Sequence, residues 1–295
     1  MSASSNSIPA VCPVCDARSR DVFSVGEYDI MGCTDCKHRF VAGRLDQQHV
    51  GEMFGDAYFT EGGAGYPDYL RLADIKTEHG RRYVDLLARH VPTGRVLDVG
   101  AAAGFVLKAF VDRGWDGVGL EPNIHMAEYG RKQLGLDMRS STLEEFQCNE
   151  QFDLVNLIQV VGHFYDLRAA MESAAALTKP GGSWLVEYWD ASSLVAKAMG
   201  SRWHNYVPPS VIHWFGRSDM DRLMAGFGFS RVATGAPKKY VDGSYLKSFL
   251  KYTIRAWPSS PALAKGLDLI PDDMRVRYPA FDLKWALFRE LLADG

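Results

Sequence analysis

Four cysteines near the amino terminus have the spacing of a metal site. Cys12 and Cys15 form one C-x-x-C pair, and Cys33 and Cys36 form a second pair after 17 intervening residues. Each pair directs two thiolates to one side of a tight turn, and two pairs supply the four sulfur ligands that tetrahedral Zn²⁺ prefers. We therefore predict a structural zinc ribbon over residues 10–45, whose four protein ligands leave no open position for catalysis. The alternative is a redox pair or a set of unligated thiols.

The stretch "LDVGAAAG" (residues 97–104) has the residue types of a ligand-binding loop. Asp98 lies within an apolar segment, and Gly100 and Gly104 bracket three alanines. Small side chains let a ligand approach the backbone, and the following helix start offers free N–H groups. Glu121, 23 residues after Asp98, ends the next apolar segment, where its carboxylate can accept both hydroxyl hydrogens of a ribose. The G-A-A-A-G spacing does not fit G-x-G-x-x-G, whose second glycine contacts a pyrophosphate.

These residues need a scaffold that brings strand ends together. Apolar segments of strand type alternate with helical segments from Arg95 to about Trp189, which predicts an α/β fold with a parallel sheet covered by helices on both faces. In such a sheet, ligands bind beyond the carboxyl ends of the strands, where the strand order reverses. A helix is expected over 69–90, a sixth strand over 229–235, and either a last antiparallel strand or a helix over 281–290. The sequence "LTKPGG" is expected to terminate the helix that starts after Asp166.

Composition restricts the class of protein. The chain has 295 residues, 47% of them hydrophobic and 23% charged, as in globular proteins with a substantial core. A net charge of −3 predicts no nucleic-acid partner. No apolar run reaches the roughly 18 residues of a membrane span, and the amino terminus lacks the features of a signal peptide, so we expect a cytoplasmic protein. The sequence leaves open whether the protein is a monomer or a homodimer.

The loop and several later motifs together resemble the class I S-adenosylmethionine-dependent methyltransferases. That family carries an acid at the end of the second strand, as in "GLEP" at Glu121, a turn beside the adenine, as in "STLEEF", "FD" opening the fourth strand, and "L-x-PGG" before the fifth. The resemblance covers roughly residues 65–235 and implies a seven-stranded Rossmann-like sheet. The expected organisation is a disordered lead (1–9), the ribbon module (10–45), a linker with helices (46–92), the methyltransferase core (93–240), and a helical extension with a possible last strand (241–295).

The resemblance also implies which residues hold S-adenosyl-L-methionine. Glu121 would bind the ribose hydroxyls, and Gln159 would lie beneath the sulfonium. Tyr66 or Tyr69 would contact the carboxylate. The full set expected at the cofactor comprises Tyr69, Asp98, Gly100, Ala101, Ala102, Gly104, Glu121, Pro122, Thr142, Leu143 and Gln159. Within this set, the residues from Gly100 to Ala102 would lie along the methionine part of the cofactor, and Thr142 and Leu143 would lie near its adenine.

The ribbon, the tyrosine-rich link and this core together resemble a bacterial group that methylates small molecules. These acceptors include nucleotide-linked deoxysugars and the sugars or lipids of cell-surface polysaccharides. The sugar C-methyltransferases of that group carry a large further domain for which 295 residues leave no room, so O-methylation of a small molecule is expected. The alternatives are C- or N-methylation of a nucleotide-sugar, methylation of RNA or protein with the ribbon as the recognition module, a Rossmann-like dehydrogenase, or a cofactor-binding scaffold without activity.

Histidines are the candidate catalytic residues. His163 in "QVVGHFYD" follows the fourth strand, where many relatives have a histidine, and its pKa suits a general base. The segment "SRWHNYVPPSVIHWF" offers His204 and His213 in an aromatic loop that would cover the acceptor, and Tyr188 is a weaker candidate. The alternative is that these side chains only stabilise their loops. Four lysines, Lys238, Lys239, Lys247 and Lys251, would either attract a phosphate-bearing substrate or form a solvated face.

Overall fold

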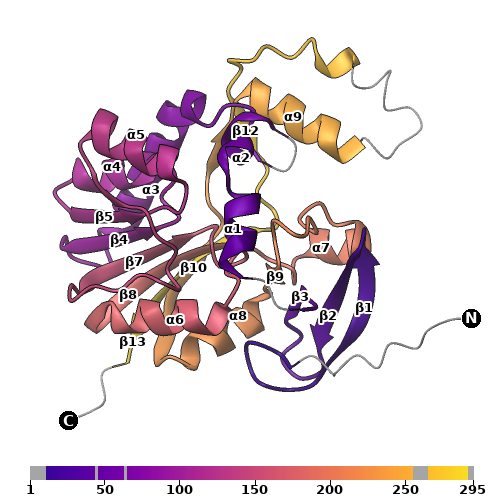
Figure 1. Cartoon of the computed structure of the whole chain (residues 1–295), viewed down its shortest axis with the longest axis horizontal. Helices are drawn as coiled ribbons and strands as arrows, with labels where there is room; N and C mark the ends of the chain where they lie inside the picture. The colour runs from indigo at the N-terminus through magenta and orange to yellow at the C-terminus, as the bar shows by residue number, and fades with distance from the viewer. Residues whose placement is uncertain (1–10, 44–45, 63–64, 255–264, 292–295) are drawn as a thin grey trace, which may run out of the picture.

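The computed structural model describes residues 11–43, 46–62, 65–254 and 265–291, so the lead expected over 1–9 lies outside the described residues. A seven-stranded sheet in the order β10-β13-β8-β7-β4-β5-β6 forms the centre of the molecule (Figure 1). Only β13 runs antiparallel to its neighbours. The strands are β4 (Arg95–Val99), β5 (Asp116–Leu120), β6 (Asp137–Arg139), β7 (Phe152–Ile158), β8 (Thr178–Trp189), β10 (Phe229–Gly235) and β13 (Leu283–Glu290).

Helices cover both faces of this sheet, as the alternating pattern predicts. On one face lie α3 (Ala73–Leu87), α4 (Phe105–Val111) and α5 (Ile124–Leu134), and on the other lie α6 (Leu167–Ala176) and α8 (Arg217–Ala225) (Figure 1). The central strands are apolar on both sides because each side packs on a helical layer. Leu97 and Val155 belong to the apolar cluster on the α6 side, and Val96 and Leu154 to the cluster on the α3 side. The α/β fold class is thus confirmed.

Local signals place the helix ends. The Asn123 side chain accepts a hydrogen bond from the Met126 amide and begins α5, which ends at Gly135 with φ +68. The expected amino-terminal cap of α6 is confirmed, because Asp166 accepts from the Ala169 amide. Side-chain acceptors at a helix start satisfy amides that have no partner within the helix.

The structure differs from the sequence-based expectation at two helix boundaries. "LTKPGG" does not end α6 at its glycines: the helix stops at Ala176 and β8 begins at Thr178. The pairing of β7 with β8 jumps from Phe152↔Thr178 to Leu154↔Ser183, so the Pro-Gly-Gly residues bulge out of the strand. The helix expected over 69–90 begins as a 3₁₀ turn, η1 (Leu70–Leu72), before α3. The segment 281–290 forms the antiparallel strand and not the helix.

The ribbon module packs directly on the main domain. Its strands β1 (Ser19–Val25) and β2 (Tyr28–Cys33) are joined by a turn at Gly26, whose φ is +60. A third strand, β3 (Arg39–Val41), pairs with β9 (His213–Trp214) of the main domain. The four-stranded sheet β1-β2-β3-β9 therefore joins the module to a loop that follows β8.

The remaining elements gather beyond the carboxyl ends of the parallel strands (Figure 1). Helices α1 (Gln47–Met53) and α2 (Asp56–Thr60) precede the core, and α7 (Leu194–Met199) with the 3₁₀ turn η2 (Gly200–Arg202) follows β8. Between β10 and β13 the chain adds α9 (Gly243–Ile254) and a two-stranded antiparallel sheet in which β11 (Lys239–Val241), before α9, pairs with β12 (Val276–Tyr278), after it. Among the described residues, no helix has the length and apolar character to cross a membrane.

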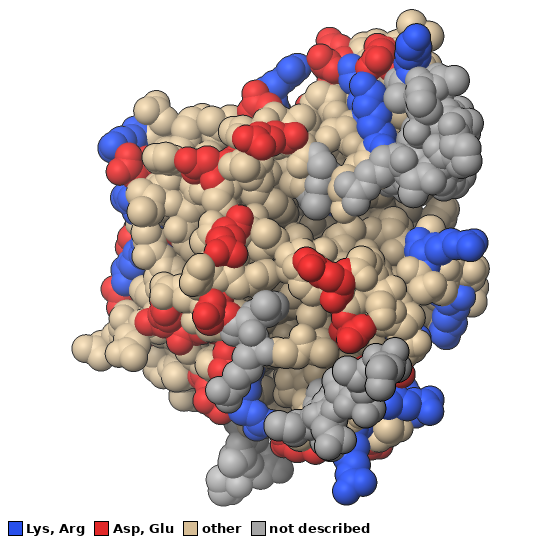
Figure 2. Space-filling view, turned by 45° about the vertical axis from the view of Figure 1, so that its right-hand side comes forward, with Lys and Arg blue, Asp and Glu red and all other residues tan. Residues whose placement is uncertain are grey.

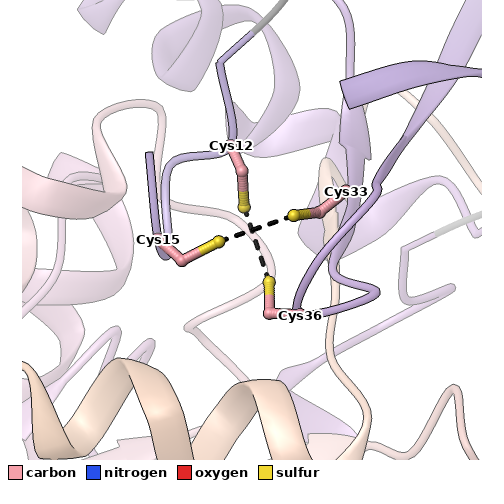
Figure 3. Close-up of side chains that lie close together, drawn as sticks. All are labelled: Cys12, Cys15, Cys33 and Cys36. Carbon is pink, nitrogen blue, oxygen red and sulfur yellow. Dashed lines mark hydrogen bonds between the residues drawn. The ribbon is translucent and has the colours of Figure 1, made fainter. Parts of the chain in front are cut away.

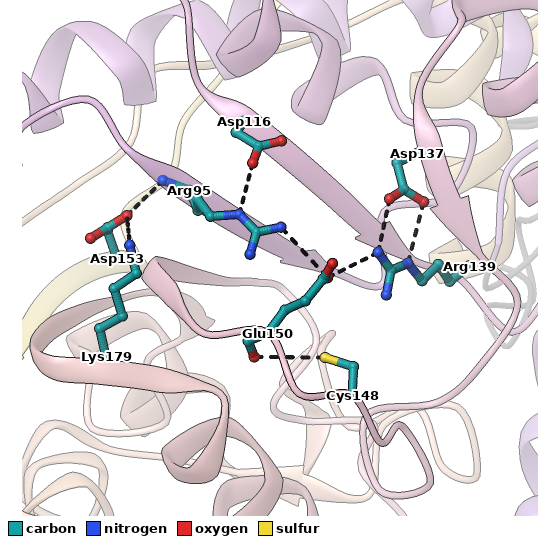
Figure 4. A network of polar contacts seen from close by, with 8 residues as sticks. All are labelled: Arg95, Asp116, Asp137, Arg139, Cys148, Glu150, Asp153 and Lys179. Atoms are coloured by element: carbon teal, nitrogen blue, oxygen red, sulfur yellow. Dashed lines mark hydrogen bonds and ion pairs between the residues drawn. The ribbon is translucent and has the colours of Figure 1, made fainter.

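A polar network ties together the loops near the amino ends of the strands (Figure 4). Arg95 binds Asp116 at 2.7 Å, and Glu150 receives Arg95 at 3.5 Å and Arg139 at 3.0 Å. The half-buried Cys148 is a free thiol that donates its S–H to the Glu150 carbonyl at 3.7 Å. Partly exposed ion pairs of this type contribute little individually, so the network mainly orders these loops.

Candidate functional site

A large cavity opens at the carboxyl ends of β4, β5 and β7. It has a volume of about 1260 Å³ including its open mouth. The strand order reverses between β4 and β7, which is where ligands of such sheets bind. Ten of the eleven residues expected at the cofactor line this cavity: Tyr69, Asp98, Gly100, Ala101, Ala102, Glu121, Pro122, Thr142, Leu143 and Gln159. Gly104 is not among the lining residues, and its role is to begin α4 with φ +84.

The loop after β4 turns through three left-handed residues. Gly100 has φ +66, Ala102 φ +50 and Gly104 φ +84. The Ala101 amide donates to the Leu120 carbonyl at 2.8 Å, which holds the loop against the end of β5. A Cβ on Gly100 would lie 3.2 Å from Val160 Cγ2, a tight contact that would require the valine to shift, and the positive φ also disfavours a side chain there. The loop therefore presents bare backbone to the cavity.

Glu121 holds this loop from the side of β5. Its carboxyl oxygens accept the Ala102 amide and the Asn123 amide, both at 2.8 Å. The side chain is buried, and burial raises the pKa of Glu121 to about 7, although the two amides counteract the shift. A carboxylate oxygen accepts more than one hydrogen bond, so Glu121 can still accept from ligand hydroxyls in the cavity.

Asp98 is a second buried acid at the same cavity. Burial raises the pKa of Asp98 to about 7, with a further contribution from Glu121 and an opposing hydrogen bond from Asn156. Two acids in one enclosed cavity, with bare backbone between them, suit a ligand that carries hydroxyls and positive charge. That chemistry matches S-adenosyl-L-methionine, which has a ribose, an ammonium group and a sulfonium. The residues present thus fit the implied cofactor.

Gln159, at the end of β7, lies where the cofactor cavity meets two further cavities, and it lines all three. Its backbone has φ +57, and its amide donates to the Glu187 carbonyl at 2.8 Å. Left-handed backbone at a non-glycine residue costs roughly 1–2 kcal/mol and is common at binding sites. The second cavity contains all four residues that the sequence nominates for catalysis: Tyr188, His163, His204 and His213.

His163 is the histidine that borders both the cofactor cavity and the second cavity. Its Nδ1 lies 2.5 Å from the Ser210 carbonyl oxygen, which can only accept, so Nδ1 carries the proton. In the neutral ring, Nε2 then has the free lone pair. Burial lowers the pKa of His163 below its ordinary value, and the carbonyls of Ser210 and Gln159 partly oppose this.

His213 has a different environment. Its Nδ1 lies 3.2 Å from Nε2 of His38, and its Nε2 lies 3.1 Å from the Phe164 carbonyl oxygen. His38 in turn contacts Asp219 at 3.3 Å. Both ring nitrogens are therefore engaged, so His213 positions the loop after β7 against the ribbon and has no free nitrogen for proton transfer.

His204 and Tyr188 line the second cavity without contacting the cofactor cavity. His204 Nε2 lies 3.6 Å from a carboxylate oxygen of Asp282, which accepts a hydrogen bond from the Trp203 indole at 2.7 Å. Burial lowers the pKa of His204, and burial raises that of Tyr188. These residues shape the wall of the second cavity.

Several cavity residues were not nominated from the sequence. Glu187 is fully buried and forms an ion pair with Lys239 on β11, and Lys76 on α3 donates to the Tyr66 hydroxyl at 3.0 Å. In the sequence, the one indication that Glu187 is unusual is its position as an acidic residue within the otherwise apolar strand "SWLVEYW". Aromatic residues complete the walls of the second cavity: Tyr58, Tyr66, Trp189, Tyr245, Phe249 and Tyr252. They come from segments far apart in the chain.

The four lysines proposed as an anion-attracting group do not act together. Lys239 lines the cofactor cavity, whereas Lys247 and Lys251 form ion pairs with Asp272 and Asp268 outside it, and Lys238 is exposed. The sequence left open an anion-attracting group or a solvated face, and of the four lysines Lys239 is the one that lines a cavity.

The four amino-terminal cysteines converge on one point (Figure 3). The Cys12 and Cys36 sulfurs are 3.7 Å apart, those of Cys15 and Cys33 are 3.5 Å apart, and all four lie within 4.8 Å of one another. Four ligands at about 2.3 Å from a tetrahedral Zn²⁺ would be roughly 3.8 Å apart. The thiolate set and its dimensions therefore fit a structural zinc ion.

Comparison with known proteins agrees with this geometry. The family model "Methyltransferase domain" matches residues 72–234. Two ubiquinone biosynthesis O-methyltransferases of Rhodopseudomonas palustris are similar in sequence. The one from strain BisB18 is 35% identical over 97 residues, covering 31% of this chain and 38% of the relative. The one from strain HaA2 is 30% identical over 148 residues, covering 45% and 57%. The chain thus spans about four to six tenths of the relatives it matches.

Two solved structures share the fold. The YcgJ protein from Bacillus subtilis has a TM-score of 0.51 at 16% identity, covering 74% of this chain and all of that one. The magnesium protoporphyrin IX methyltransferase from Synechocystis, solved with bound S-adenosylhomocysteine, has a TM-score of 0.50 at 11% identity, covering 83% and 94%. The family model matches more than half of the chain and the cavity lies where such sheets bind their cofactor. The chain therefore belongs to the methyltransferase-domain family and contains a class I S-adenosylmethionine-dependent methyltransferase domain.

Proposed function

We propose that this methyltransferase methylates a hydroxyl oxygen of a small-molecule acceptor, a sugar or natural-product intermediate, with His163 as general base. The acceptor site is the second cavity, whose aromatic walls suit a small ring that can stack. Two sequence relatives are named O-methyltransferases, which supports oxygen as the acceptor atom. The observation that carries the proposal is the position of His163 on the wall shared by both cavities, with its proton fixed on Nδ1.

The chain's own residues have distinct tasks in this proposal. When bound, S-adenosyl-L-methionine supplies a methyl group carried on a sulfonium. Glu121 would accept the ribose hydroxyls, the loop from Gly100 to Ala102 would hold the methionine part, and Leu143 with Thr142 would hold the adenine, because all of them line the cavity. His163 Nε2 takes the proton of the acceptor hydroxyl, while the Ser210 carbonyl stabilises the imidazolium through Nδ1. The aromatic walls exclude water and align the acceptor.

Replacing His163 tests the base. We expect His163→Ala to lower kcat by about 10²–10⁴-fold, the usual contribution of a general base, with unchanged affinity for S-adenosylhomocysteine. The measurement is S-adenosylhomocysteine release with an acceptor found by mass spectrometry, alongside calorimetric binding. His125→Ala, at an exposed position on α5, is the matched control. Turnover equal to that of the wild type would refute the assignment.

A panel of acceptors tests the substrate class. Nucleotide-sugars, free glycosides and small phenols are incubated with labelled cofactor, together with tRNA and a protein mixture. On the face seen in Figure 2, Lys and Arg lie mainly around the margin and Asp and Glu between them, an unfavourable surface for RNA. Labelling confined to tRNA or protein would favour the alternative in which the ribbon recognises a macromolecule, and labelling at carbon or nitrogen would exclude O-methylation.

We also propose that Cys12, Cys15, Cys33 and Cys36 hold one structural Zn²⁺. The support is the convergence of four sulfurs at separations suited to a tetrahedral ion. Elemental analysis of the purified protein should find about one zinc per chain, the ratio that four thiolate ligands require. Absence of metal from protein purified without chelators would contradict this.

A further inference from the structure

The second cavity, proposed above as the acceptor site, has a wall without uncompensated charge. Among the described residues that line it there is no Lys, Arg or Asp, and its one acid, Glu187, forms an ion pair with Lys239. Burial lowers the pKa of His163, His204 and His213, so all three rings are neutral near pH 7. A phosphate group carries about −1.5 to −2 charges at pH 7 and is bound by cationic donors. The wall therefore suits an uncharged group.

His204 lines the second cavity but neither of the other two cavities. Its ring contacts the rings of Trp189, Trp203 and Phe249 edge to face, with centroid separations of 5.1, 5.9 and 5.8 Å. These aromatic residues come from β8, from the segment after η2, and from α9. Edge-to-face contacts with three rings fix the orientation of the imidazole in the wall.

A buried carboxylate decides which nitrogen of His204 carries the proton. Nε2 is buried, has no hydrogen-bond partner among the described residues, and lies 3.6 Å from a carboxylate oxygen of Asp282. The same oxygen accepts a hydrogen bond from the Trp203 indole at 2.7 Å, which fixes its position. A lone pair on Nε2 would face this negative charge, so the proton lies on Nε2 and Nδ1 keeps the lone pair. The side chain is 14% exposed, and because Nε2 is buried, the exposed part belongs to the remainder of the side chain, which includes Nδ1.

We propose that His204 binds the acceptor through Nδ1, which accepts a hydrogen bond from a second hydroxyl of an uncharged ring, while His163 faces the hydroxyl that is methylated. The inference rests on the small-molecule function proposed above and narrows its acceptor to a ring with at least two hydroxyls and no phosphate. A hydroxyl is an uncharged donor that suits a lone pair in a neutral wall. A nucleotide-linked sugar does not fit, because its phosphates would lack cationic partners in this cavity.

Binding of small probes to the protein loaded with S-adenosylhomocysteine tests the role of His204. The probes are the three dihydroxybenzenes and methyl glucoside, with phenol as the comparison that has one hydroxyl and phenyl phosphate as the charged comparison. We expect at least one probe with several hydroxyls to bind the wild type more tightly than phenol does. A dihydroxybenzene in that place indicates an aromatic acceptor, and methyl glucoside indicates a sugar.

His204→Phe removes the nitrogen and keeps a ring between Trp189 and Phe249. Its affinity for the preferred probe should fall by roughly three- to tenfold, as for loss of one neutral hydrogen bond, while its affinity for phenol stays unchanged. His204→Asn, whose amide oxygen can occupy the position of Nδ1, should recover part of the preference. His125→Phe, at an exposed position on α5, is the matched control. Thermal melting shows whether the variants are folded.

Four results would overturn the proposal. They are a wild type that binds no probe more tightly than phenol, a His204→Phe variant that weakens phenol and the preferred probe equally or weakens neither, a His204→Asn variant that binds no better than His204→Phe, and tighter binding of phenyl phosphate than of the hydroxylated probes. Methylation of a bound probe at carbon, with affinity still dependent on His204, would contradict the O-methylation proposed above and leave this inference intact.

Discussion

Ala102 stands where the loop after β4 requires a left-handed backbone. Its φ of +50 costs an L-residue with a Cβ roughly 1–2 kcal/mol, and glycine removes that strain while adding about 0.4–1 kcal/mol of unfolded-state entropy. We therefore expect Ala102→Gly to leave the melting temperature unchanged or slightly higher, with cofactor affinity retained. Ala102→Val should lower both, because a branched side chain is strained there and fills the cavity wall. Melting curves and calorimetry with S-adenosylhomocysteine check this; a destabilised Ala102→Gly would show that the strain is absent.

The two buried acids make cofactor binding dependent on pH. Burial raises the pKa of Glu121 from its ordinary value of 4.5 to about 7. Its contribution to the stability of the free protein is therefore complete below pH 4.5 and lost as the pH rises through about 7. Ribose hydroxyls favour the charged form, so we expect affinity for S-adenosylhomocysteine to increase between about pH 6 and pH 8.

Calorimetry at three pH values measures this dependence, with Glu121→Gln as the comparison. The variant should bind more weakly at about pH 8 and show a smaller rise with pH, because one of the cavity's acids no longer titrates, while Asp98 and Glu144 still titrate near 7. A wild-type affinity that is constant across this pH range would contradict the assignment of Glu121 to the cofactor hydroxyls.

At the scale of elements, the contact between α3 and α4 depends on one glycine. A Cβ on Gly80 would lie 2.7 Å from the Ala109 Cβ and 2.8 Å from the Val106 carbonyl, whereas a Cβ on Gly51 of α1 would meet nothing within 4 Å. We expect Gly80→Ala to destabilise the protein by about 1–3 kcal/mol through overpacking. Gly51→Ala should be neutral or stabilising by up to about 1 kcal/mol, from helix propensity. Denaturant unfolding compares the two, and equal effects would contradict the close packing of α3 on α4.

At the scale of the whole molecule, the ribbon supports the loop that carries the Ser210 carbonyl. Strand β3 pairs with β9, and His38 binds His213. No residue from 11–43 lines the cofactor cavity. Removing the zinc ion proposed for the four cysteines should therefore speed amide exchange over residues 205–215 and lower turnover, while affinity for S-adenosylhomocysteine changes little.

Hydrogen exchange measured with and without a zinc chelator tests this coupling, and Cys148→Ser controls for thiol effects outside the metal site. Faster exchange in the ribbon with unchanged exchange over 205–215 would show that the module is independent of the acceptor loop.

Short-range sequence patterns predicted much of the structure of this protein. The alternation of apolar strands and helices predicted the sheet and both helical layers, since burial on two faces imposes its own pattern. The cysteine spacing predicted the convergence of four sulfurs, and the acid at Glu121 with the small residues of the β4 loop predicted the wall of one cavity. These features depend on residues close together in the chain or at the ends of adjacent strands.

The lining of the second cavity, the proposed acceptor site, depends on tertiary structure. Tyr58, Trp189 and Phe249 come together only because α2, β8 and α9 meet over the same strand ends, and no short-range pattern encodes that meeting. The sequence nominated both His163 and His213, yet one ring nitrogen of His213 is engaged by His38, which lies 175 residues away in the chain. Likewise, Glu187 and Lys239 pair inside the protein although nothing near either residue in the sequence indicates a partner. The sequence by itself determined the fold, the cysteine cluster and the small residues of the loop after β4, whereas contacts between distant segments decided which titratable groups face the second cavity.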